Sequence, residues 1–301
     1  MPVSVRRQIE LRADASGFPA LKRAAAALSE AYREGKPTRV TSDDQVNAYL
    51  VTRMPATYAA AHAALEQLPD LPITSVLDIG AGSGAATLAA LKRFPGAREF
   101  SLIERDPSLA DAAREFLPDA TVLCSDATSM RDFPEHDLVI AAYSLGEMQA
   151  GLAARLWAAA RVALLVIEPG TPRGAAQITQ VREELLALGA HMAAPCPAAM
   201  RCPLSADDWC HFAARVERTS LHRRLKDGDL GYEDEKFSYV AVTREPVELN
   251  GSRVLRHPKH HAGWIELELC TASGTRHERA TKRDRERFRQ ARRAEWGSRL
   301  P

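Results

Sequence analysis

A glycine-rich loop between an apolar strand and a helix constrains this chain more than any other feature. It reads VLDIGAGSGAA over residues 76–86, with glycines at Gly80, Gly82 and Gly84. These glycines permit a tight turn and a close approach of the backbone to a ligand that faces the next helix's N-terminus. The spacing G-x-G-x-G differs from the G-x-G-x-x-G of dinucleotide-binding domains. Asp78 precedes the loop, where its carboxylate suits an ammonium group, and the helix N-terminus suits a carboxylate.

Two further acids lie at predicted strand ends. Glu104 ends the second strand and is placed to accept ribose hydroxyls, and Asp126 ends the third strand and suits an adenine amino group. A methionine moiety carries both an ammonium and a carboxylate group, so loop and acids together predict an S-adenosylmethionine (SAM) site. The alternatives are a nicotinamide-binding Rossmann domain and a glycine turn that binds nothing.

Strands and helices alternate from Thr74 to about Gly189. Apolar strands are predicted over 75–80, 99–106, 121–126, 137–145 and 163–170, with helices over 84–94, 107–117 and 152–162 between them. This pattern is typical of a parallel sheet wrapped by helices, in which right-handed crossovers bring all ligand-binding strand ends to one edge. The sequence therefore predicts an α/β class I SAM-dependent methyltransferase (Rossmann-like) fold.

The rest of the chain flanks this core, and the break at Pro55 divides one N-terminal helical stretch that Ser42 is expected to cap. Later strands are predicted over 236–244, 253–257 and 263–270. We therefore expect five regions, which are an N-terminal helical region (1–70), the SAM-binding core (71–189), a cysteine-rich metal-binding insertion with a basic helix (190–235), strands closing the sheet and the metal site (236–275), and a basic C-terminal tail (276–301).

The segment after the fourth strand lacks a recognisable catalytic motif. It reads AAYSLGEM over 141–148, which is neither the Asn/Asp-Pro-Pro-aromatic motif of amino methyltransferases nor the cysteine pair of pyrimidine-carbon methyltransferases. Methyl transfer needs an in-line nucleophile and sometimes a base. Tyr143, Ser144 and Glu147 lie where such groups would be, although the sequence favours a structural role for each.

Four of the five cysteines lie outside the sheet core. Cys196, Cys202 and Cys210 are spaced C-x5-C-x7-C among prolines, and Cys270 follows at a distance. In a reducing compartment such a group predicts a thiolate metal site, either zinc or a [4Fe–4S] cluster, and the wide spacing favours iron. Ordinary buried cysteines are the alternative. The fifth, Cys124, is expected to be a buried small residue on the third strand.

Four histidines, which could replace one cysteine ligand, accompany these segments: His191, His211, His260 and His261.

The net charge of +1 is unevenly distributed. Residues 276–301 hold ten basic and four acidic side chains, so this segment carries +6 and the remainder about −5. Phosphates attract arginine forks, so a polyanionic partner such as RNA is expected, with a solvated charged helix as the alternative. The candidate RNA contacts lie on a predicted helix after the third cysteine and in the tail, and are Arg215, Arg218, Arg223, Arg224, Lys226, Arg283, Arg285, Arg292 and Arg293.

The sequence shows neither an apolar run long enough to span a membrane nor a secretory signal. We therefore expect a cytosolic location and no membrane partner. DNA is not an expected partner.

Several segments together resemble the methyltransferase-like proteins of the small ribosomal subunit, found in mitochondria and bacteria. They are DIGAGSGAA, APCPAAMRCPLSADDWCHF, HRRLKDGDLGYEDEKFSYV, ELCTASG and ARRAEWG, so the resemblance covers roughly residues 40–300. It implies a [4Fe–4S] cluster on Cys196, Cys202, Cys210 and Cys270, SAM at the glycine loop, and association with small-subunit ribosomal RNA during assembly. Ala198-Ala199 departs from relatives that often carry a histidine there, at no proposed ligand.

The short N-terminus suits a bacterial, cytoplasmic protein, with eukaryotic relatives in the mitochondrial matrix. The leading hypothesis is a SAM-dependent RNA methyltransferase-like protein of the small ribosomal subunit. Its alternatives are a non-catalytic assembly factor that uses SAM and the cluster structurally, and a zinc-bearing small-molecule methyltransferase.

Overall fold

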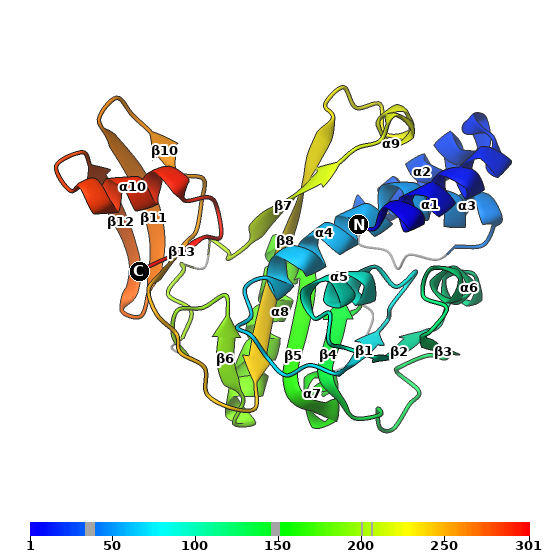
Figure 1. Cartoon of the computed structure of the whole chain (residues 1–301), viewed down its shortest axis with the longest axis horizontal. Helices are drawn as coiled ribbons and strands as arrows, with labels where there is room; N and C mark the ends of the chain where they lie inside the picture. The colour runs from blue at the N-terminus through cyan, green and yellow to red at the C-terminus, as the bar shows by residue number, and fades with distance from the viewer. Residues whose placement is uncertain (34–39, 146–150, 200, 206) are drawn as a thin grey trace.

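A mixed eight-stranded sheet forms the centre of the computed structural model, which describes residues 1–33, 40–145, 151–199, 201–205 and 207–301 (Figure 1). Its strand order is β3-β2-β1-β4-β5-β8-β6, and β7 pairs with β8 outside this path. The strands are β1 (Ser75–Ile79), β2 (Glu99–Glu104), β3 (Thr121–Cys124), β4 (His136–Ala142), β5 (Ala160–Pro169), β6 (His191–Ala194), β7 (Phe212–Glu217) and β8 (Tyr232–Thr243).

The first five strands are parallel, whereas β8 runs antiparallel to both β5 and β6. The order 3-2-1-4-5 is that of doubly wound folds, and it confirms the predicted α/β class. The antiparallel strand beyond β5 gives the mixed sheet that fits class I methyltransferases. Consequently the ends of β1, β2, β4 and β5 meet at one carboxyl edge.

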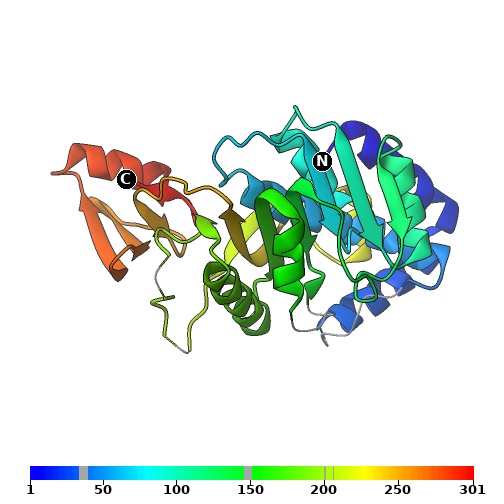
Figure 2. The same cartoon turned by 90° about the horizontal axis from the view of Figure 1, so that it is seen from below.

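Helices cover both faces of this sheet (Figure 2). Successive residues of a strand point to opposite faces of the sheet, so Val76 belongs to one apolar cluster and the adjacent Leu77 to the other. The helices packed on the Val76 side are α4 (Met54–Leu65), α5 (Ala85–Arg93) and α6 (Pro107–Phe116), and those on the Leu77 side are α7 (Leu152–Ala159) and α8 (Pro172–Ala187). None of the described helices is both long and apolar enough to cross a bilayer.

Three helices precede α4, namely α1 (Val3–Ser16), α2 (Phe18–Arg33) and α3 (Asp43–Thr52). Ser42 caps α3 by accepting a hydrogen bond from the Gln45 amide, as predicted. Pro55 lies in the first turn of α4, where its missing N–H leaves no helix bond unmade, so the chain breaks at Arg53. The junction of α3 and α4 therefore presents Arg53 toward the sheet's carboxyl edge.

The strand β8 is longer than predicted and extends past the end of β5. Its second half pairs with β5, from Phe237 opposite Pro169 to Thr243 opposite Ala163, while residues 232–237 pair with β7. A short helix, α9 (Ser220–Leu225), connects β7 to β8. We call β7, α9 and residues 232–237 the ribbon; it projects beyond the sheet in Figure 1.

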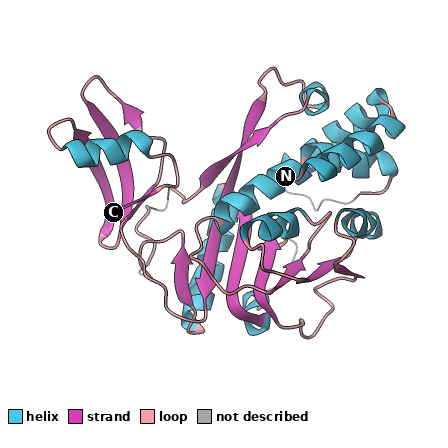
Figure 3. Cartoon of the chain, viewed as in Figure 1, coloured by secondary structure: helices cyan, strands magenta, loops and turns pink. Residues whose placement is uncertain are grey.

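The residues after the central sheet form a small antiparallel lobe with one helix on it (Figure 3). Its elements are β9 (Ser252–Val254), β10 (Lys259–His260), β11 (Trp264–Thr271), β12 (Gly274–Thr281), α10 (Arg285–Arg293) and β13 (Arg299–Leu300). Leu267, Leu269 and Ala291 belong to its own apolar core. The expected basic tail is thus folded, and β6, placed in the expected insertion, belongs to the main sheet.

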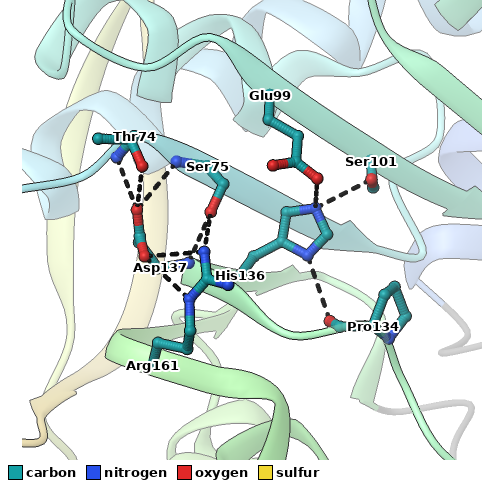
Figure 4. A network of polar contacts seen from close by, with 8 residues as sticks. All are labelled: Thr74, Ser75, Glu99, Ser101, Pro134, His136, Asp137 and Arg161. Carbon is teal, nitrogen blue, oxygen red and sulfur yellow. Dashed lines mark hydrogen bonds and ion pairs between the residues drawn. The ribbon is translucent and has the colours of Figure 1, made fainter.

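A polar network ties the amino ends of β1 and β4 together, at the edge opposite the glycine loop (Figure 4). Asp137 accepts hydrogen bonds from the Thr74 amide and hydroxyl at 2.8 and 2.6 Å, and it pairs with Arg161 at 3.0 Å. Burial raises the pKa of Asp137, but these donors more than offset it, so the pKa lies below its ordinary value. Here the polar groups hold strands in place.

We expect Asp137→Ala to lower the free energy of unfolding by about 2 kcal/mol at pH 7, because it leaves partly buried donors unpaired. A carboxyl group with a lowered folded pKa stabilises above its unfolded pKa, and this contribution is lost as pH falls through the folded pKa. The difference in unfolding free energy between wild type and Asp137→Ala, measured by urea titration, should therefore become smaller below about pH 4. Asp132→Asn, at an 87% exposed side chain, is the control; equal stability of Asp137→Ala and wild type at pH 7 would contradict the assignment.

Candidate functional site

The glycine loop lies at the carboxyl edge and is held against β2. The amides of Gly80 and Ala81 donate to the Ile103 carbonyl at 2.8 and 3.1 Å. Gly84 has φ 82° and caps α5, a left-handed conformation that favours glycine. A Cβ on Gly82, at φ 54°, would lie 2.9 Å from the Tyr49 hydroxyl, so α3 closes one side of the loop.

Asp78 is completely buried below this loop. Its Oδ2 accepts hydrogen bonds from the amide and hydroxyl of Thr87, at 3.1 and 2.7 Å. Its Oδ1 is buried and has no hydrogen-bond partner among the residues that the structure describes. Burial raises the pKa of Asp78 to about 6, against the opposing hydrogen bonds from Thr87. One carboxylate oxygen is thus unpaired among the described residues, and its contact with a ligand ammonium remains a prediction.

Glu104 lies beside the loop at the end of β2. Its two oxygens accept hydrogen bonds from the Gly82 and Asp106 amides, at 2.7 and 2.8 Å. Burial is the main cause that raises its pKa. The structure therefore brings Asp78, Glu104 and the loop together, as the sequence predicted.

Asp126 lies farther out, after the edge strand β3. It is exposed and accepts hydrogen bonds from the amide and hydroxyl of Thr128, which lower its pKa. Contact with an adenine remains a prediction for this residue. Cys124 is exposed as well, so the expectation that it is buried was wrong; β3 is an edge strand with little covering it.

The segment after β4 turns sharply at Tyr143, which has φ 58°. The Tyr143 amide donates to the Ile167 carbonyl at 2.8 Å, and the Ser144 hydroxyl donates to the Ile79 carbonyl at 3.0 Å. Glu168, buried at the end of β5, accepts a hydrogen bond from the Leu145 amide at 2.9 Å. Glu147 lies outside the described residues. The segment is thus fixed to the ends of both β1 and β5.

The Tyr143 hydroxyl contacts a residue that the sequence did not single out. It donates to Oε1 of Glu235 at 3.0 Å, and the same oxygen lies 3.5 Å from Nη2 of Arg53. Tyr49, Arg53 and Glu235 were all missed by sequence reasoning. Their contacts span 33 to 182 residues, as the Tyr49–Gly82 and Arg53–Glu235 pairs show, so no local pattern could have revealed them.

The four predicted metal cysteines gather between the main sheet and the small lobe. Charge on Cys196, Cys202 and Cys270 raises the pKa of Cys210, in addition to the larger effect of burial. Burial also raises the pKa of Cys196, and that of Cys270 to about 12, with further contributions from neighbouring thiols. However, across the described residues no group of three or more His, Cys, Asp or Glu side chains is arranged to hold a metal ion.

Two arginines face these thiols. Arg182 on α8 hydrogen-bonds the Cys196 thiol. Arg253 on β9 is 2% exposed and donates to the carbonyls of Pro195 and Gly297, at 2.8 and 2.7 Å. Its Nη2 has no hydrogen-bond partner within the described ranges, and the ion pairs found there give it no carboxylate. A buried guanidinium therefore lies beside the thiols of Cys196, Cys210 and Cys270, a position that favours anionic sulfur.

Aromatic rings surround this junction. Trp209 stacks on His211 with ring centroids 5.3 Å apart, and Trp296 contacts His211 edge-on at 4.8 Å. Trp209 Nε1 donates to the Gly170 carbonyl at 3.0 Å. Burial lowers the pKa of His211. The residues around Cys210 thus join the main sheet to the small lobe.

The predicted RNA contacts near the ribbon are largely paired inside the protein. Arg218 and Lys226 both form ion pairs with Glu233, and Arg215 pairs with Asp234 at 3.1 Å. Arg215 lies on β7 rather than on the expected helix. Burial raises the pKa of Glu233, but hydrogen bonds from Lys226 and Arg218 and the contact with His222 hold it far below its ordinary value. Arg224 stacks on the Phe18 ring. These cations stabilise the ribbon.

The arginines of the small lobe are more exposed. Arg253 is buried, and Arg287, which was not among the predicted contacts, pairs with Glu278. The other predicted contacts, which all have exposed side chains, lie on or before α10 and are Arg283, Arg285, Arg292 and Arg293. Arg289 shares this exposure. The structure therefore offers α10 as a cationic surface.

The comparisons with solved structures return methyltransferases. A SAM-dependent methyltransferase from Aquifex aeolicus has a TM-score of 0.43 at 14% identity, over 68% of this chain and 100% of that one. The plantazolicin methyltransferase BpumL has a TM-score of 0.44 at 10% identity, over 76% of this chain and 98% of its own. At such scores the case for the fold rests on the strand order above.

Sequence comparison identifies the family. Two Schizosaccharomyces pombe proteins, the mitochondrial Rsm22-cox11 tandem proteins 1 and 2, are each 24% identical over 347 positions, which cover 91% of this chain and 45% of theirs. The chain thus spans less than half the length of these relatives. The family model described as mitochondrial small ribosomal subunit Rsm22 matches residues 43–301. Because that match covers most of the chain, the protein belongs to the Rsm22 family.

Proposed function

We propose that this protein binds SAM and acts on the RNA of the small ribosomal subunit as a methyltransferase during assembly, in the bacterial cytoplasm. The observation that carries the proposal is the buried Oδ1 of Asp78 beneath the glycine loop. A buried carboxylate oxygen needs a donor, and the SAM ammonium supplies one with a full charge. Glu104 is near enough to the loop to take the ribose hydroxyls. When bound, SAM supplies an activated methyl group.

The small-subunit partner is supported by the family description and by α10. Its exposed arginines suit phosphate oxygens, which guanidinium groups bind in pairs of hydrogen bonds. The ribbon cations are assigned a smaller part in RNA contact, because they already pair with carboxylates of residues 233–234. RNA binding should therefore depend chiefly on the small lobe.

We also propose a [4Fe–4S] cluster on Cys196, Cys202, Cys210 and Cys270. The donor set fits, because four thiolates bind iron–sulfur clusters or zinc. Arg253 fits too, because it is buried beside them and has no carboxylate partner among the described residues, while a four-thiolate site carries net negative charge. The cysteines must close together to ligate, as they are not arranged to hold an ion here. Zinc in the same site is the alternative.

A non-catalytic assembly factor is the second candidate. It is favoured by the segment around Tyr143, which carries neither of the methyltransferase motifs expected at this position. Tyr143 and Arg53 also both donate hydrogen bonds to Glu235. In this alternative, SAM would stabilise the carboxyl edge without losing its methyl group. A zinc-bearing small-molecule methyltransferase is less well supported by the family.

The test is a Gly82→Val variant, whose side chain would meet Tyr49 in a left-handed loop, expressed in place of the wild-type gene. We expect lost SAM binding by calorimetry and accumulation of immature small subunits. If the subunits mature normally although SAM binding is lost, the SAM-dependent proposal fails. Normal maturation in a variant that cannot transfer methyl groups but still binds SAM would favour the non-catalytic factor.

For RNA, we expect Gln at Arg285, Arg289 and Arg292 together to weaken binding of a small-subunit rRNA fragment about 10- to 100-fold. The slope of log affinity against log salt should fall by about 2 to 3, since each lost phosphate contact accounts for nearly one unit. A matched control replaces three other exposed arginines, Arg7, Arg131 and Arg173. Equal weakening by both sets, measured by filter binding, would show that α10 is not the contact surface.

A further inference from the structure

Three segments distant in sequence place Tyr143, Arg53 and Glu235 together above the carboxyl edge. Tyr143 follows β4, Arg53 lies between α3 and α4, and Glu235 belongs to the ribbon. We propose that Glu235, oriented by Tyr143 and Arg53, binds the N–H group of the acceptor base and takes its proton during methyl transfer. This inference rests on the proposed methyltransferase function and names the acceptor side of that site.

The position of Tyr143 links the group to the SAM side. Residues 76–79 pair with 138–141, so Tyr143 lies two residues past the last β1–β4 pair, which involves Ile79. Ser144 fixes the segment to Ile79 itself, immediately before the glycine loop. A tyrosine at φ 58° adopts the left-handed backbone conformation, which is strained for a residue with a side chain. Such strain is typical of functional sites, and here it directs the hydroxyl to Glu235.

Glu235 reaches the same place from the other side. The Gly170 amide donates to the Lys236 carbonyl at 2.9 Å, so the ribbon passes directly over the end of β5. A Cβ on Gly170 would lie 2.8 Å from the backbone of Lys236 and Phe237, which shows how close this approach is. Glu235 is therefore held at the sheet's carboxyl edge by backbone contacts.

The surroundings suit a reacting carboxylate. The side chains of Glu235 and Arg53 are 12% and 17% exposed, so both are shielded from water but not sealed. Among the residues that the structure describes, both contacts to the carboxylate use Oε1. Oε2 is thereby left for a ligand donor. Glu235 differs from Glu233 two residues earlier, whose oxygens are both taken by ribbon cations.

The chemistry follows from these positions. The lone pair of an acceptor nitrogen attacks the methyl carbon of SAM, a new C–N bond forms, and the C–S bond breaks to leave a neutral thioether. The nitrogen then carries a positive charge and an extra proton, which Glu235 Oε2 accepts. The Tyr143 hydroxyl and the Arg53 guanidinium hold the carboxylate in place throughout. The fitting acceptor is an unpaired base with an exocyclic amino or ring N–H group.

The experiment compares wild type with Glu235→Gln, Tyr143→Phe and the control Glu217→Gln, at a 78% exposed ribbon carboxylate. Transfer of labelled methyl groups from SAM to rRNA of immature small subunits is measured beside the calorimetric affinity for SAM. We expect Glu235→Gln to lower transfer about 100-fold and Tyr143→Phe about 10-fold, with SAM affinity within twofold. Glu217→Gln should match wild type.

Retention of at least half the wild-type transfer by Glu235→Gln would overturn the inference and leave the methyltransferase proposal intact. If wild type binds SAM yet transfers nothing, both the enzymatic proposal and this inference fall. A parallel loss of SAM affinity in Glu235→Gln would also count against the inference, because it would place the carboxylate on the SAM side. Melting temperatures of all variants check that each is folded.

Discussion

Replacing Asp78 with asparagine is expected to weaken SAM binding about 100-fold without destabilising the protein. The asparagine side-chain oxygen can still accept the hydrogen bonds that Thr87 gives Oδ2. The lost charge would leave the ligand ammonium without its buried partner, which costs on the order of 3 kcal/mol. Calorimetric titration with SAM measures the affinity.

The pH dependence should follow the same carboxyl group. Its pKa is raised by burial to about 6, so the carboxylate that binds the ammonium is half protonated there. Each pH unit below 6 should reduce the affinity of wild type up to about tenfold. The affinity of Asp78→Asn should stay level from pH 5 to 8 apart from effects common to both proteins. A parallel decline in both would show that another group titrates.

The free energy of unfolding of the ligand-free protein should fall as the pH rises, whereas the affinity for SAM should increase. A carboxyl whose folded pKa exceeds its unfolded value binds its proton more tightly in the folded state, so wild type loses stability as pH rises from about 4 to 6. That loss is on the order of 3 kcal/mol at neutral pH. Asparagine carries no such charge, so urea unfolding at pH 7 should find the variant at least as stable as wild type. Asp111→Asn, on the surface of α6, is the control for both assays.

The fold between residues 74 and 189 was predictable because apolar strands and helices alternate there in short, regular segments. The loop at Gly80 to Gly84 and the acid at Asp78 could be placed at one edge from connection rules alone. Their packing partners could not. Tyr49 reaches the loop and Arg53 reaches Glu235 from a helical stretch whose sequence shows only an apolar pattern.

The ribbon shows why local propensity failed. Residues 215–226 are rich in arginine, which favours helices, and the sequence predicted one there. The structure forms a helix there only over 220–225, as α9, and pairs β7, which precedes it, with β8. Asp234 lies opposite Arg215 and forms an ion pair with it, while Glu233 pairs with Arg218 and Lys226. Tertiary pairing overrode propensity, and the same pairing removed these cations from the expected RNA surface.

The C-terminal residues were misjudged for a similar reason. Their dense charge concealed β12 and α10, which pack against the predicted strand over 263–270, where Ile265, Leu267 and Leu269 belong to the small core. Because α10 packs on that face, the residues that the charge count predicted to be a tail form part of a folded lobe. Contact with RNA remains a prediction for its exposed arginines.

Loss of one cysteine ligand is expected to remove the proposed iron–sulfur cluster. We expect protein purified without oxygen to hold about four irons per chain and to show a broad absorbance shoulder near ~400 nm. Cys202→Ser should abolish both, because three thiolates no longer complete the site. Cys124→Ser offers a matched control, since that cysteine is exposed on β3 and takes no part in the proposed site. Equal iron loss in both variants would contradict the ligand assignment.

Proton release should accompany loading. Burial and neighbouring charge raise the pKa values of Cys196, Cys210 and Cys270, so these thiols are protonated at pH 7 until a metal displaces the protons. Reconstitution in weak buffer should therefore acidify the solution. The fraction of protein that is loaded should increase as the pH rises toward about 9. Stoichiometric zinc without visible absorbance would keep the four ligands and remove the iron–sulfur proposal.

Arg253 provides a test of whether the four cysteines form a metal site or are ordinary buried thiols. Its buried charge has no carboxylate partner in the described part of the chain, and its Nη2 is unbonded there, so the thiolates are its natural counter-ions. Arg253→Gln should speed cluster loss to a chelator about tenfold, followed as decay of the visible absorbance. Arg256→Gln, which removes an ion pair with Asp208 nearby, controls for disturbance of the lobe. If both variants lose the cluster at the wild-type rate, the guanidinium does not serve the thiolates, and the case for a dedicated metal centre loses its strongest structural support.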